Sequence, residues 1–237
     1  MDLDQFFDAA VPVMRGIVPV ESSELTTGPD RVEPSALGRY PRLVHAQHVR
    51  AMNAMFRGLE QMTRAEHPGK YLQWVNTYLS LHPSSHRHPS YRGQHFAAFL
   101  AGSDAPPWAA EVADLRFTEF LVASAEGARC EVRRYLYDVA AHRTCAPGPG
   151  PVDVLVYRDP VSLRARAHYA TLAELAAIAQ ERGELPVDWL SRAQLKPSDL
   201  EAGRKSVLRL TGGDAQAVAR SGAEDFAASD PMGGLRK

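Results

Sequence analysis

The sequence lacks several features that would assign the chain to a familiar class. Only two of its 237 residues are cysteines, Cys130 and Cys145, and they form no CxxC pair. A disulfide-built fold is therefore not expected, and two reduced thiols are the simplest interpretation. No apolar run approaches about 18 residues, so no membrane span is predicted. The acidic start MDLDQFF also lacks the basic segment of a secretory signal. These absences predict a cytoplasmic protein.

An excess of charge of one sign is also missing. The chain carries 27 Lys and Arg residues against 28 Asp and Glu residues, a net charge of −1. Proteins that bind nucleic acid usually show a clear basic excess, so this balance argues against nucleic acid as a partner. The hydrophobic content of 45% is enough for one large or two small globular cores.

Recognised catalytic motifs are absent as well. The sequence contains no G-x-S-x-G, no G-x-G-x-x-G, no Walker loop and no H-E-x-x-H. Ser84 and Ser85 lie near histidines, but nothing in the sequence supplies a third group to orient such a base. We therefore predict no catalytic residue in this chain.

Apolar residues at helical spacing predict an N-terminal helical domain over residues 1–126. Proline- and glycine-containing loops of ordinary length separate the segments, which is typical of a compact helical domain. The predicted helices span residues 4–17, 37–67, 70–81, 93–100 and 108–125, with an arm or loop at 19–34.

Histidines cluster between two of these helices. The cluster consists of His82, His86, His88 and His95. Imidazoles ligate zinc and iron, so a metal site is one interpretation. However, Pro83 and Pro89 indicate a loop, and no carboxylate lies close by in sequence to orient a ligand. A partner-contacting loop and an ordinary solvated loop are the alternatives, and we predict no metal site. The candidate partner-interface residues are His86, His88, Tyr91 and Trp108.

The second half of the chain changes from helical to strand-like patterns. Strands are predicted at 130–139, with a bulge, at 152–157 and at 163–169, and the proline-rich run at 146–151 is predicted to be a loop. Helices should follow from Thr171, from Pro186 and from Ser198. Capping boxes are predicted for Thr171 with Glu174 and for Ser198 with Glu201. The predicted fold is α+β: the helical domain, then a small winged-helix-like domain over 127–237 whose tail from Ala215 is loosely held.

The third predicted strand, 163–169, has one apolar and one basic face. It leads directly into a helix, so we expect no further strand of this chain to cover it. An uncovered edge strand offers N–H and C=O groups to an extended peptide, and arginines could pair with acidic residues of that peptide. The alternative is a central strand whose arginines are merely solvated. The candidate peptide-binding residues are Leu163, Arg164, Ala165, Arg166, Ala167, His168, Tyr169, Arg204, Val207 and Leu208.

The order of the segments resembles a known family. The helical segments read RLVHAQHVRAMNAMFRGLEQM, YLQWVNTYLSLHPSSHRHPS, YRGQHFAAFLA and PPWAAEVADLRFTEF. They resemble the N-terminal domain of the methanobactin biosynthesis protein C-like family, long labelled as DNA-binding. The segments CEVRRYLYDV, VDVLVYRDP and LRARAHYATLAELAAIA follow the order of that family's C-terminal half. The resemblance covers about residues 35–210. The chain departs from the family at residues 44–48, where relatives commonly have a Tyr-Arg-x-Asn-like start to the first long helix.

The resemblance implies a non-catalytic partner subunit. Members of this family pair with multinuclear-iron, TIM-barrel-like enzymes that modify cysteines of ribosomally made peptides. Their C-terminal half looks like a RiPP recognition element, a winged-helix module that binds the leader of the precursor peptide. For this chain the resemblance implies a heterodimer with such an enzyme, which would hold the iron, and no cofactor of its own.

Two other functions remain open from the residues alone. The first is a winged-helix DNA-binding transcriptional regulator, for which Arg204, Lys205 and Arg209 would be the basic residues of a recognition helix. Residues 129–210 hold 13 basic and 10 acidic residues, a net charge of only +3. The second is a hydrolase or metalloenzyme built on the histidine loop.

Overall fold

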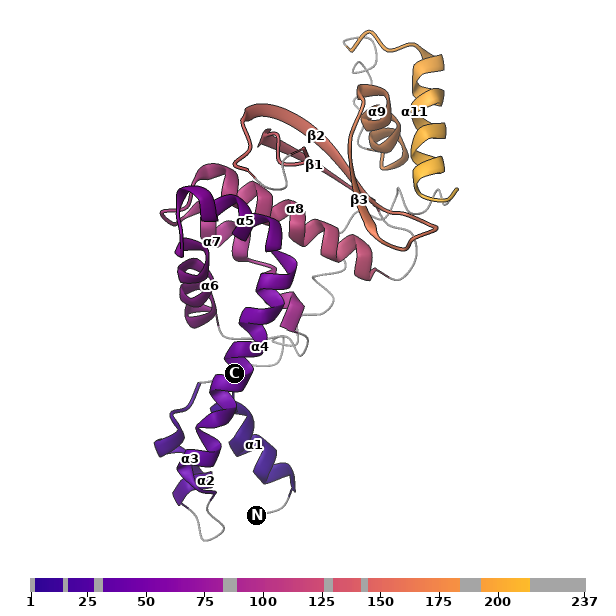
Figure 1. Cartoon of the computed structure of the whole chain (residues 1–237). Helices are drawn as coiled ribbons and strands as arrows, with labels where there is room; N and C mark the ends of the chain where they lie inside the picture. The colour runs from indigo at the N-terminus through magenta and orange to yellow at the C-terminus, as the bar shows by residue number, and fades with distance from the viewer. Residues whose placement is uncertain are drawn as a thin grey trace. The chain divides into compact units, whose positions relative to one another are not determined.

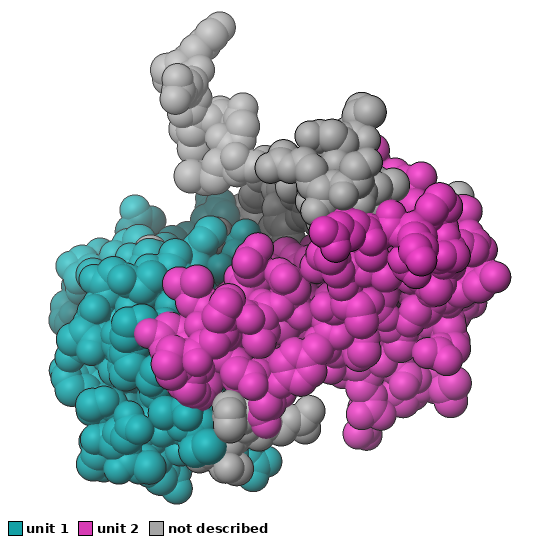
Figure 2. All heavy atoms as spheres, turned by 90° about the horizontal axis from the view of Figure 1, so that it is seen from above, with its two compact units in different colours: residues 1–113, 143–146 teal, residues 114–142, 147–237 magenta. Residues whose placement is uncertain are grey.

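The computed structural model describes residues 3–14, 17–27, 32–82, 89–125, 130–141, 145–183 and 193–213. In these residues the protein is α+β, with a helical N-terminal part and a small antiparallel sheet of three strands (Figure 1). The chain divides into two compact units, coloured separately in Figure 2. Unit 1 comprises residues 1–113 and 143–146, and unit 2 comprises residues 114–142 and 147–237.

Unit 1 is helical wherever it has regular structure among the described residues. Its helices are α1 (Leu3–Met14), η1 (Val20–Ser22), α2 (Glu24–Thr27), α3 (Pro34–Leu37), α4 (Arg39–Met55), α5 (Arg57–Glu66), α6 (Lys70–Leu81), η2 (Pro89–Gly93), α7 (Phe96–Ala101) and the start of α8 (Pro107–Ser124). The segment 19–34 was predicted to be an arm or loop, and the structure shows the short helices η1 and α2 within it. Hydroxyl groups stabilise these short turns: Ser23 Oγ accepts from Leu25 N–H at 3.3 Å, and Thr26 Oγ1 donates to the Val20 carbonyl at 3.0 Å.

The long helix predicted over residues 37–67 is two helices that meet at Phe56. The backbone of Phe56 leaves the helical region, with φ −101° and ψ 24°. Its side chain is completely buried, and its ring centroid lies 5.0 Å from that of Phe96. A Cβ atom at Gly93 would lie 2.8 Å from Met55 Sδ and 2.9 Å from the Phe56 ring, so a larger residue there would have to displace these side chains. Because apolar spacing continues across the break, the sequence pattern does not reveal it.

Reciprocal hydrogen bonds join the end of α6 to η2. The hydroxyl of Tyr78 donates to the Arg92 carbonyl at 2.6 Å, and Arg92 Nη2 donates to the Leu79 carbonyl at 2.9 Å. A cation in this position complements the negative end of the helix dipole. Burial lowers the pKa of Arg92 and raises that of Tyr78.

Helix α8 contributes to both units. Its residues up to Ala113 belong to unit 1, and those from Asp114 onward belong to unit 2. The domain limits expected from the sequence, 1–126 and 127–237, stay predictions.

The sheet of unit 2 has the strand order β1-β2-β3, with both pairs antiparallel. Cys130 of β1 lies opposite Tyr157 of β2, and Tyr169 of β3 lies opposite Val154. A register shift between Tyr135 and Tyr137 confirms the predicted bulge. The elements are β1 (Cys130–Tyr137), β2 (Pro149–Arg158), β3 (Ala165–Tyr169), α9 (Leu172–Glu181) and α11 (Pro197–Leu210).

One face of the sheet packs against α9 and α11. Cys130 and Leu155 form a core there with Ile178 of α9 and Val207 of α11. Burial raises the pKa of the Cys130 thiol to about 11, as expected for a structural cysteine.

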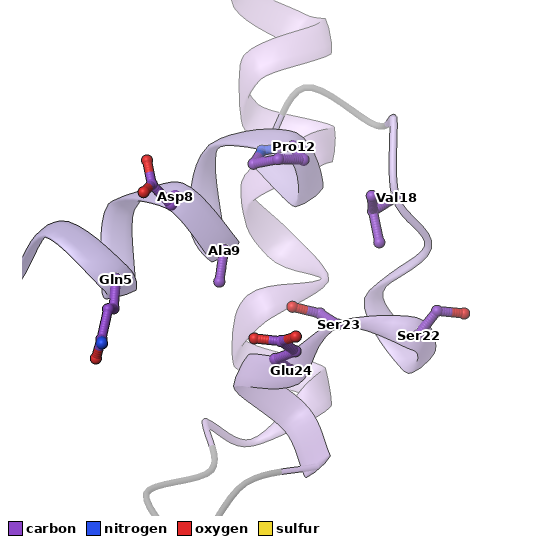
Figure 3. Close-up of a pocket in the computed structure, with 8 residues that line it drawn as sticks. All are labelled: Gln5, Asp8, Ala9, Pro12, Val18, Ser22, Ser23 and Glu24. Carbon is purple, nitrogen blue, oxygen red and sulfur yellow. The ribbon is translucent and has the colours of Figure 1, made fainter. Parts of the chain in front are cut away.

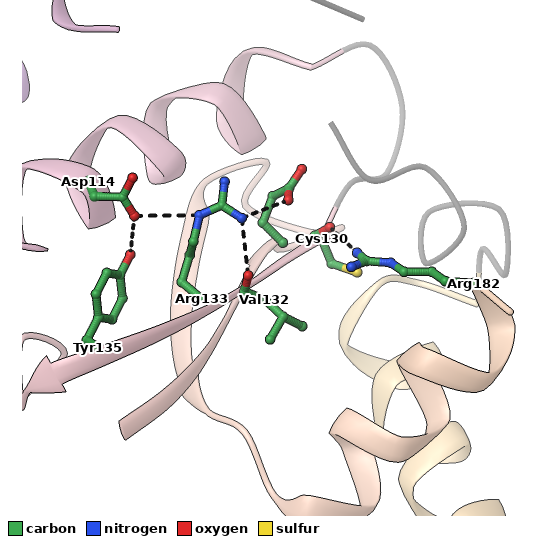
Figure 4. Close-up of polar contacts among 7 residues, drawn as sticks. Asp114, Cys130, Val132, Arg133, Tyr135 and Arg182 are labelled. Atoms are coloured by element: carbon green, nitrogen blue, oxygen red, sulfur yellow. Dashed lines mark hydrogen bonds and ion pairs between the residues drawn. The ribbon is translucent and has the colours of Figure 1, made fainter. Parts of the chain in front are cut away.

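The opposite face of the sheet carries Tyr135 and Arg133, which contact α8. The Tyr135 hydroxyl donates to Asp114 Oδ2 at 2.8 Å, and Arg133 Nε lies 3.5 Å from the same oxygen (Figure 4). Val154 and Val156 of β2 are completely buried, as is Leu155 between them. β2 is therefore buried on both faces, which explains its run of consecutive apolar residues.

The predicted starts of β2 and α11 are wrong. β2 begins at Pro149, inside the predicted loop, and Pro149 lies opposite Tyr137 of β1. This part of β2 extends past the end of β3, so among the described residues it pairs with β1 alone. Proline is tolerated there because the other side of the strand needs no N–H donor. Helix α11 begins at Pro197, with Asp199 Oδ2 accepting from Lys196 N–H at 2.9 Å, instead of at the predicted Ser198–Glu201 box. Most of the helix predicted from Pro186, and the tail from residue 215, lie outside the described residues.

Candidate peptide-binding site

β3 is the last strand in the sheet order and, among the described residues, pairs with β2 alone. Two main-chain hydrogen bonds flank the strand. Asp159 N–H donates to the Arg164 carbonyl at 2.9 Å, and Ala170 N–H donates to the Asp153 carbonyl at 2.8 Å. Hydrogen-bonded and non-hydrogen-bonded pairs alternate along an antiparallel ladder, so these two bonds fix the pattern between them.

This alternation determines which main-chain groups face the open edge. The pairs Tyr157–Arg166 and Leu155–His168 fall on hydrogen-bonding positions. The N–H and C=O groups of Arg166 and His168 therefore point toward β2. Those that point away from β2 belong to Ala165, Ala167 and Tyr169.

The loop before β3 contains two residues that were predicted to lie in the strand. Asp159 Oδ1 accepts from Val161 N–H at 2.9 Å and from Ser162 N–H at 2.8 Å, which closes a turn. Hydrogen bonds from Ser162 and Val161 hold the pKa of Asp159 below its usual range. Leu163 has a positive φ of 56°, so the chain becomes extended only after Arg164. The predicted strand start at Leu163 is wrong, because the turn that begins at Asp159 continues through Leu163.

The basic face of β3 lies on the side of the sheet that α9 and α11 cover. Arg166 Nε lies 3.7 Å from Asp159 Oδ2, and His168 Nε2 lies 3.3 Å from Glu174 Oε2. Each of these two residues therefore already has a carboxylate neighbour. Arg164 is exposed and forms no ion pair with a described residue.

Glu174 connects β3, α9 and α11. Its buried carboxylate accepts from Thr171 N–H at 2.9 Å, from Thr171 Oγ1 at 3.0 Å and from Ser206 Oγ at 2.7 Å. Burial acts to raise the pKa of Glu174, but the hydrogen bonds from Ser206 and Thr171 outweigh it and hold that pKa below its usual range. Glu174 N–H also donates to Thr171 Oγ1 at 3.2 Å, which confirms the predicted capping box.

The α11 residues that were predicted to border a peptide groove lie in different places. Val207 is 2% exposed and packs in the core, so it does not form an open apolar wall. Leu208 is half-buried. Arg204 is exposed, and its Nε lies 2.9 Å from Glu181 Oε1 of α9.

Apolar side chains lie exposed in sequence positions that flank β3. Val161 is 92% exposed, Leu163 56%, Tyr169 45% and Leu172 46%. Leu163 and Tyr169 were candidates from the sequence, whereas Val161 and Leu172 were missed. The sequence did contain a signal for these two residues. Val161 is an apolar residue in the turn before β3, and Leu172 is an apolar residue in the first turn of the helix after it. Exposed apolar groups at a free strand edge are typical of an interaction surface.

Two of the four predicted partner-interface residues of unit 1, Tyr91 and Trp108, lie among the described residues. Trp108 is only 6% exposed, so little of its ring is accessible, and Tyr91 is half-buried. His86 and His88 lie outside the described residues. In the part of the chain that the structure describes, no group of three or more His, Cys, Asp or Glu side chains could hold a metal ion. Nor is any helix there long and apolar enough to cross a membrane.

A pocket of about 440 Å³ lies in unit 1 between α1 and the turns that follow it (Figure 3). Its lining consists of Gln5, Asp8, Ala9, Pro12, Val18, Ser22, Ser23 and Glu24. These residues include serines but no histidine or cysteine, so they offer no paired nucleophile and base. The edge of β3 is therefore the stronger candidate site.

No protein-family model matches this chain, and a search of curated proteins finds no significant match.

Proposed function

We propose that this chain is a non-catalytic partner subunit that binds the leader of a ribosomally made precursor peptide. It presents that peptide to a multinuclear-iron, TIM-barrel-like enzyme that modifies its cysteines. In this proposal unit 2 is a winged-helix-like RiPP recognition element, and the iron belongs to the enzyme. The observation that carries the proposal is the open edge of β3, where the main-chain groups of Ala165, Ala167 and Tyr169 point away from the sheet.

An extended peptide that pairs with this edge becomes a fourth strand. Its main-chain groups bond to those of Ala165, Ala167 and Tyr169, which supplies affinity for almost any sequence. Specificity then comes from its side chains, which alternate between the two faces of the sheet. On one face they meet the small residues Ala165 and Ala167, and on the other they meet Arg166 and His168. A leader is disordered when free, so these contacts must offset the entropy lost on ordering it.

The charges near the edge favour an acidic leader through one residue above all. Arg164 is exposed and has no described carboxylate partner, whereas Arg166 shares Asp159. The alternative, DNA binding through α11, is weakened by ion pairs on that helix. Arg204 pairs with Glu181, and Lys205 lies 3.6 Å from Glu201.

Proline substitution at Ala167 tests the proposal. The Ala167 N–H points away from β2, so Ala167→Pro removes a donor from the open edge without removing a bond within the sheet. Titration calorimetry should use the precursor peptide of this proposal, with its leader intact. We expect about tenfold weaker binding or more, because one hydrogen bond is lost and the proline ring obstructs the edge.

The matched control is Ala167→Gly, which keeps the N–H group and should bind within about threefold of the wild type. Circular dichroism establishes that both variants are folded. Equal affinity for wild type and a folded Ala167→Pro variant would show that the leader does not add to β3. Binding of a DNA duplex in place of the peptide would support the regulator instead.

A further inference from the structure

Unit 1 contains a long stretch without acidic residues. Between Glu33 and Glu60 the chain has Arg39, Arg42, Arg50 and Arg57 but no Asp or Glu. Most of this stretch is α4, whose first turn contains no acidic residue. Negative charge is favoured near a helix N-terminus and positive charge is disfavoured there, so Arg39 and Arg42 do not serve the stability of α4.

Three of these arginines share one face of α4. At 100° per residue, six residues of α4 lie within about 100° of one another around the helix axis, and one of them, Asn53, is half-buried. We call the other five the α4 arginine stripe: Arg39, Arg42, Leu43, Ala46 and Arg50. All five are exposed, and Leu43 is 59% exposed. The opposite face of α4 holds Met52, which is 1% exposed, so the helix is buried on one side and open on the other.

The arginines of the stripe have no carboxylate partners among the described residues. Arg39, Arg42 and Arg50 form no ion pair with any described residue. Arginines elsewhere do pair: Arg64 Nη2 lies 2.6 Å from Glu60 Oε1, and Arg116 Nη1 lies 2.6 Å from Glu119 Oε2. The stripe thus presents guanidinium groups that no described carboxylate pairs with, around an exposed leucine.

From this surface we infer that the α4 arginine stripe is the docking surface of unit 1 for an acidic face of the partner enzyme. The inference rests on the proposed function and names the surface that the enzyme contacts. Guanidinium groups bind carboxylates through two parallel hydrogen bonds, and arginine is enriched at the centres of protein interfaces. In this inference the face of the partner enzyme carries carboxylates spaced along a helix or strand. These carboxylates surround an apolar pocket in which Leu43 binds. The small side chain of Ala46 allows that face to approach α4 closely.

A protein partner fits this stripe better than nucleic acid does. Unit 1 carries 11 basic and 11 acidic residues, so it lacks the overall positive charge that drives binding to a phosphate backbone. An exposed leucine in the middle of the stripe also matches an apolar pocket, whereas phosphates offer none.

The test reverses charge on the stripe in the full-length chain. The variant Arg42→Glu with Arg50→Glu is compared with Arg134→Glu with Arg209→Glu, which changes the net charge equally at exposed positions of unit 2. Binding to the proposed iron enzyme is measured by biolayer interferometry. We expect the α4 variant to bind about tenfold more weakly or worse, and the unit 2 variant to bind within about threefold of the wild type.

Circular dichroism and thermal unfolding establish that each variant is folded, and leader binding by each variant alone checks unit 2. If the wild type binds the enzyme and a folded α4 variant binds it equally well, the inference is wrong while the proposed function stands. If the wild type binds neither the leader nor the enzyme, the proposed function fails as well. Arginine-dependent binding of a 20-base-pair DNA duplex, tighter than binding of the enzyme, would also overturn the inference. Leu43→Ser gives a second measurement, and we expect it to weaken the complex without changing the charge.

Discussion

The side chain of Glu174 has two roles, one in capping its own helix and one in contacts with other elements. Its spacing from Thr171 predicts a capping box, and both bonds of that box are present. The same carboxylate also accepts from Ser206 of α11 and contacts His168 of β3. The box was visible in the sequence because its two members are three residues apart. The contacts with His168 and Ser206 depend on packing and have no sequence signal.

Replacing the Glu174 carboxylate should destabilise unit 2. Glu174→Gln keeps the size of the side chain but removes the charge and one acceptor, which leaves donors such as Ser206 Oγ with a poorer partner. We expect the free energy of unfolding to fall by about 1–3 kcal/mol. Urea denaturation followed by circular dichroism measures this loss. The control is Glu201→Gln on the exposed face of α11, where we expect a change below about 0.5 kcal/mol. Equal effects for the two variants would show that the Glu174 network contributes little.

The lowered pKa of Glu174 predicts how this contribution depends on pH. Because its pKa is lower in the folded protein than the usual 4.5, folding is favoured while the carboxylate is ionised. The contribution is complete above about pH 4.5 and is lost as the pH falls through the lower folded value. The stability gap between wild type and Glu174→Gln should therefore shrink below pH 4.5. Denaturation curves from pH 3 to pH 7 test this, and a gap that widens in acid would contradict it.

At the scale of elements, α9 and α11 cross at a glycine. A Cβ atom on Gly203 would lie 2.2 Å from the Ala173 carbonyl oxygen, which is backbone and cannot move aside alone. The helices therefore approach so closely that no side chain fits between them at this point. This contact positions Val207 in the core and Ser206 against Glu174.

Alanine at position 203 should force α9 and α11 apart. We expect Gly203→Ala to lower the free energy of unfolding by about 2 kcal/mol or more, despite the better helix propensity of alanine. Thermal and urea unfolding measure the change. The matched control is Gly150→Ala in β2, where a Cβ atom would meet nothing within 4 Å. A stabilising effect of Gly203→Ala would mean that the two helices do not approach as closely as described.

The sequence predicted most elements of this fold, because residues that repeat at helix or strand spacing carry the signal themselves. Helix α6 and the bulge in β1 were predicted in this way. The break at Phe56, the late start of β3 and the buried position of Val207 were not. Each of these depends on contacts with residues distant in sequence or on side chains that cap a turn. For the candidate site, the sequence indicated the strand but not which of its main-chain groups face outward, since that follows from the register with β2.

At the scale of the whole molecule, nearly balanced charge conceals an uneven distribution. The net charge is −1, yet no described carboxylate pairs with the arginines of the α4 arginine stripe. The edge of β3 differs, because Arg166 and His168 already lie beside carboxylates and much of the offered contact is main chain. The two proposed interactions therefore rest on different physical forces, one mainly electrostatic and the other mainly hydrogen bonding and apolar contact.

Salt should separate these two interactions. The screening length falls from about 10 Å at 0.1 M salt to about 4 Å at 0.5 M, which weakens exposed charge pairs most. Between these salt concentrations we expect the affinity for the enzyme to fall by about tenfold or more, and the affinity for the leader to change by less than about threefold. Calorimetry with each partner in a salt series measures both. The Arg42→Glu with Arg50→Glu variant should not lose affinity for the enzyme as salt rises, because its carboxylates repel the acidic face and salt screens that repulsion. A steeper salt dependence for the leader than for the enzyme would reverse the assignment of the two surfaces.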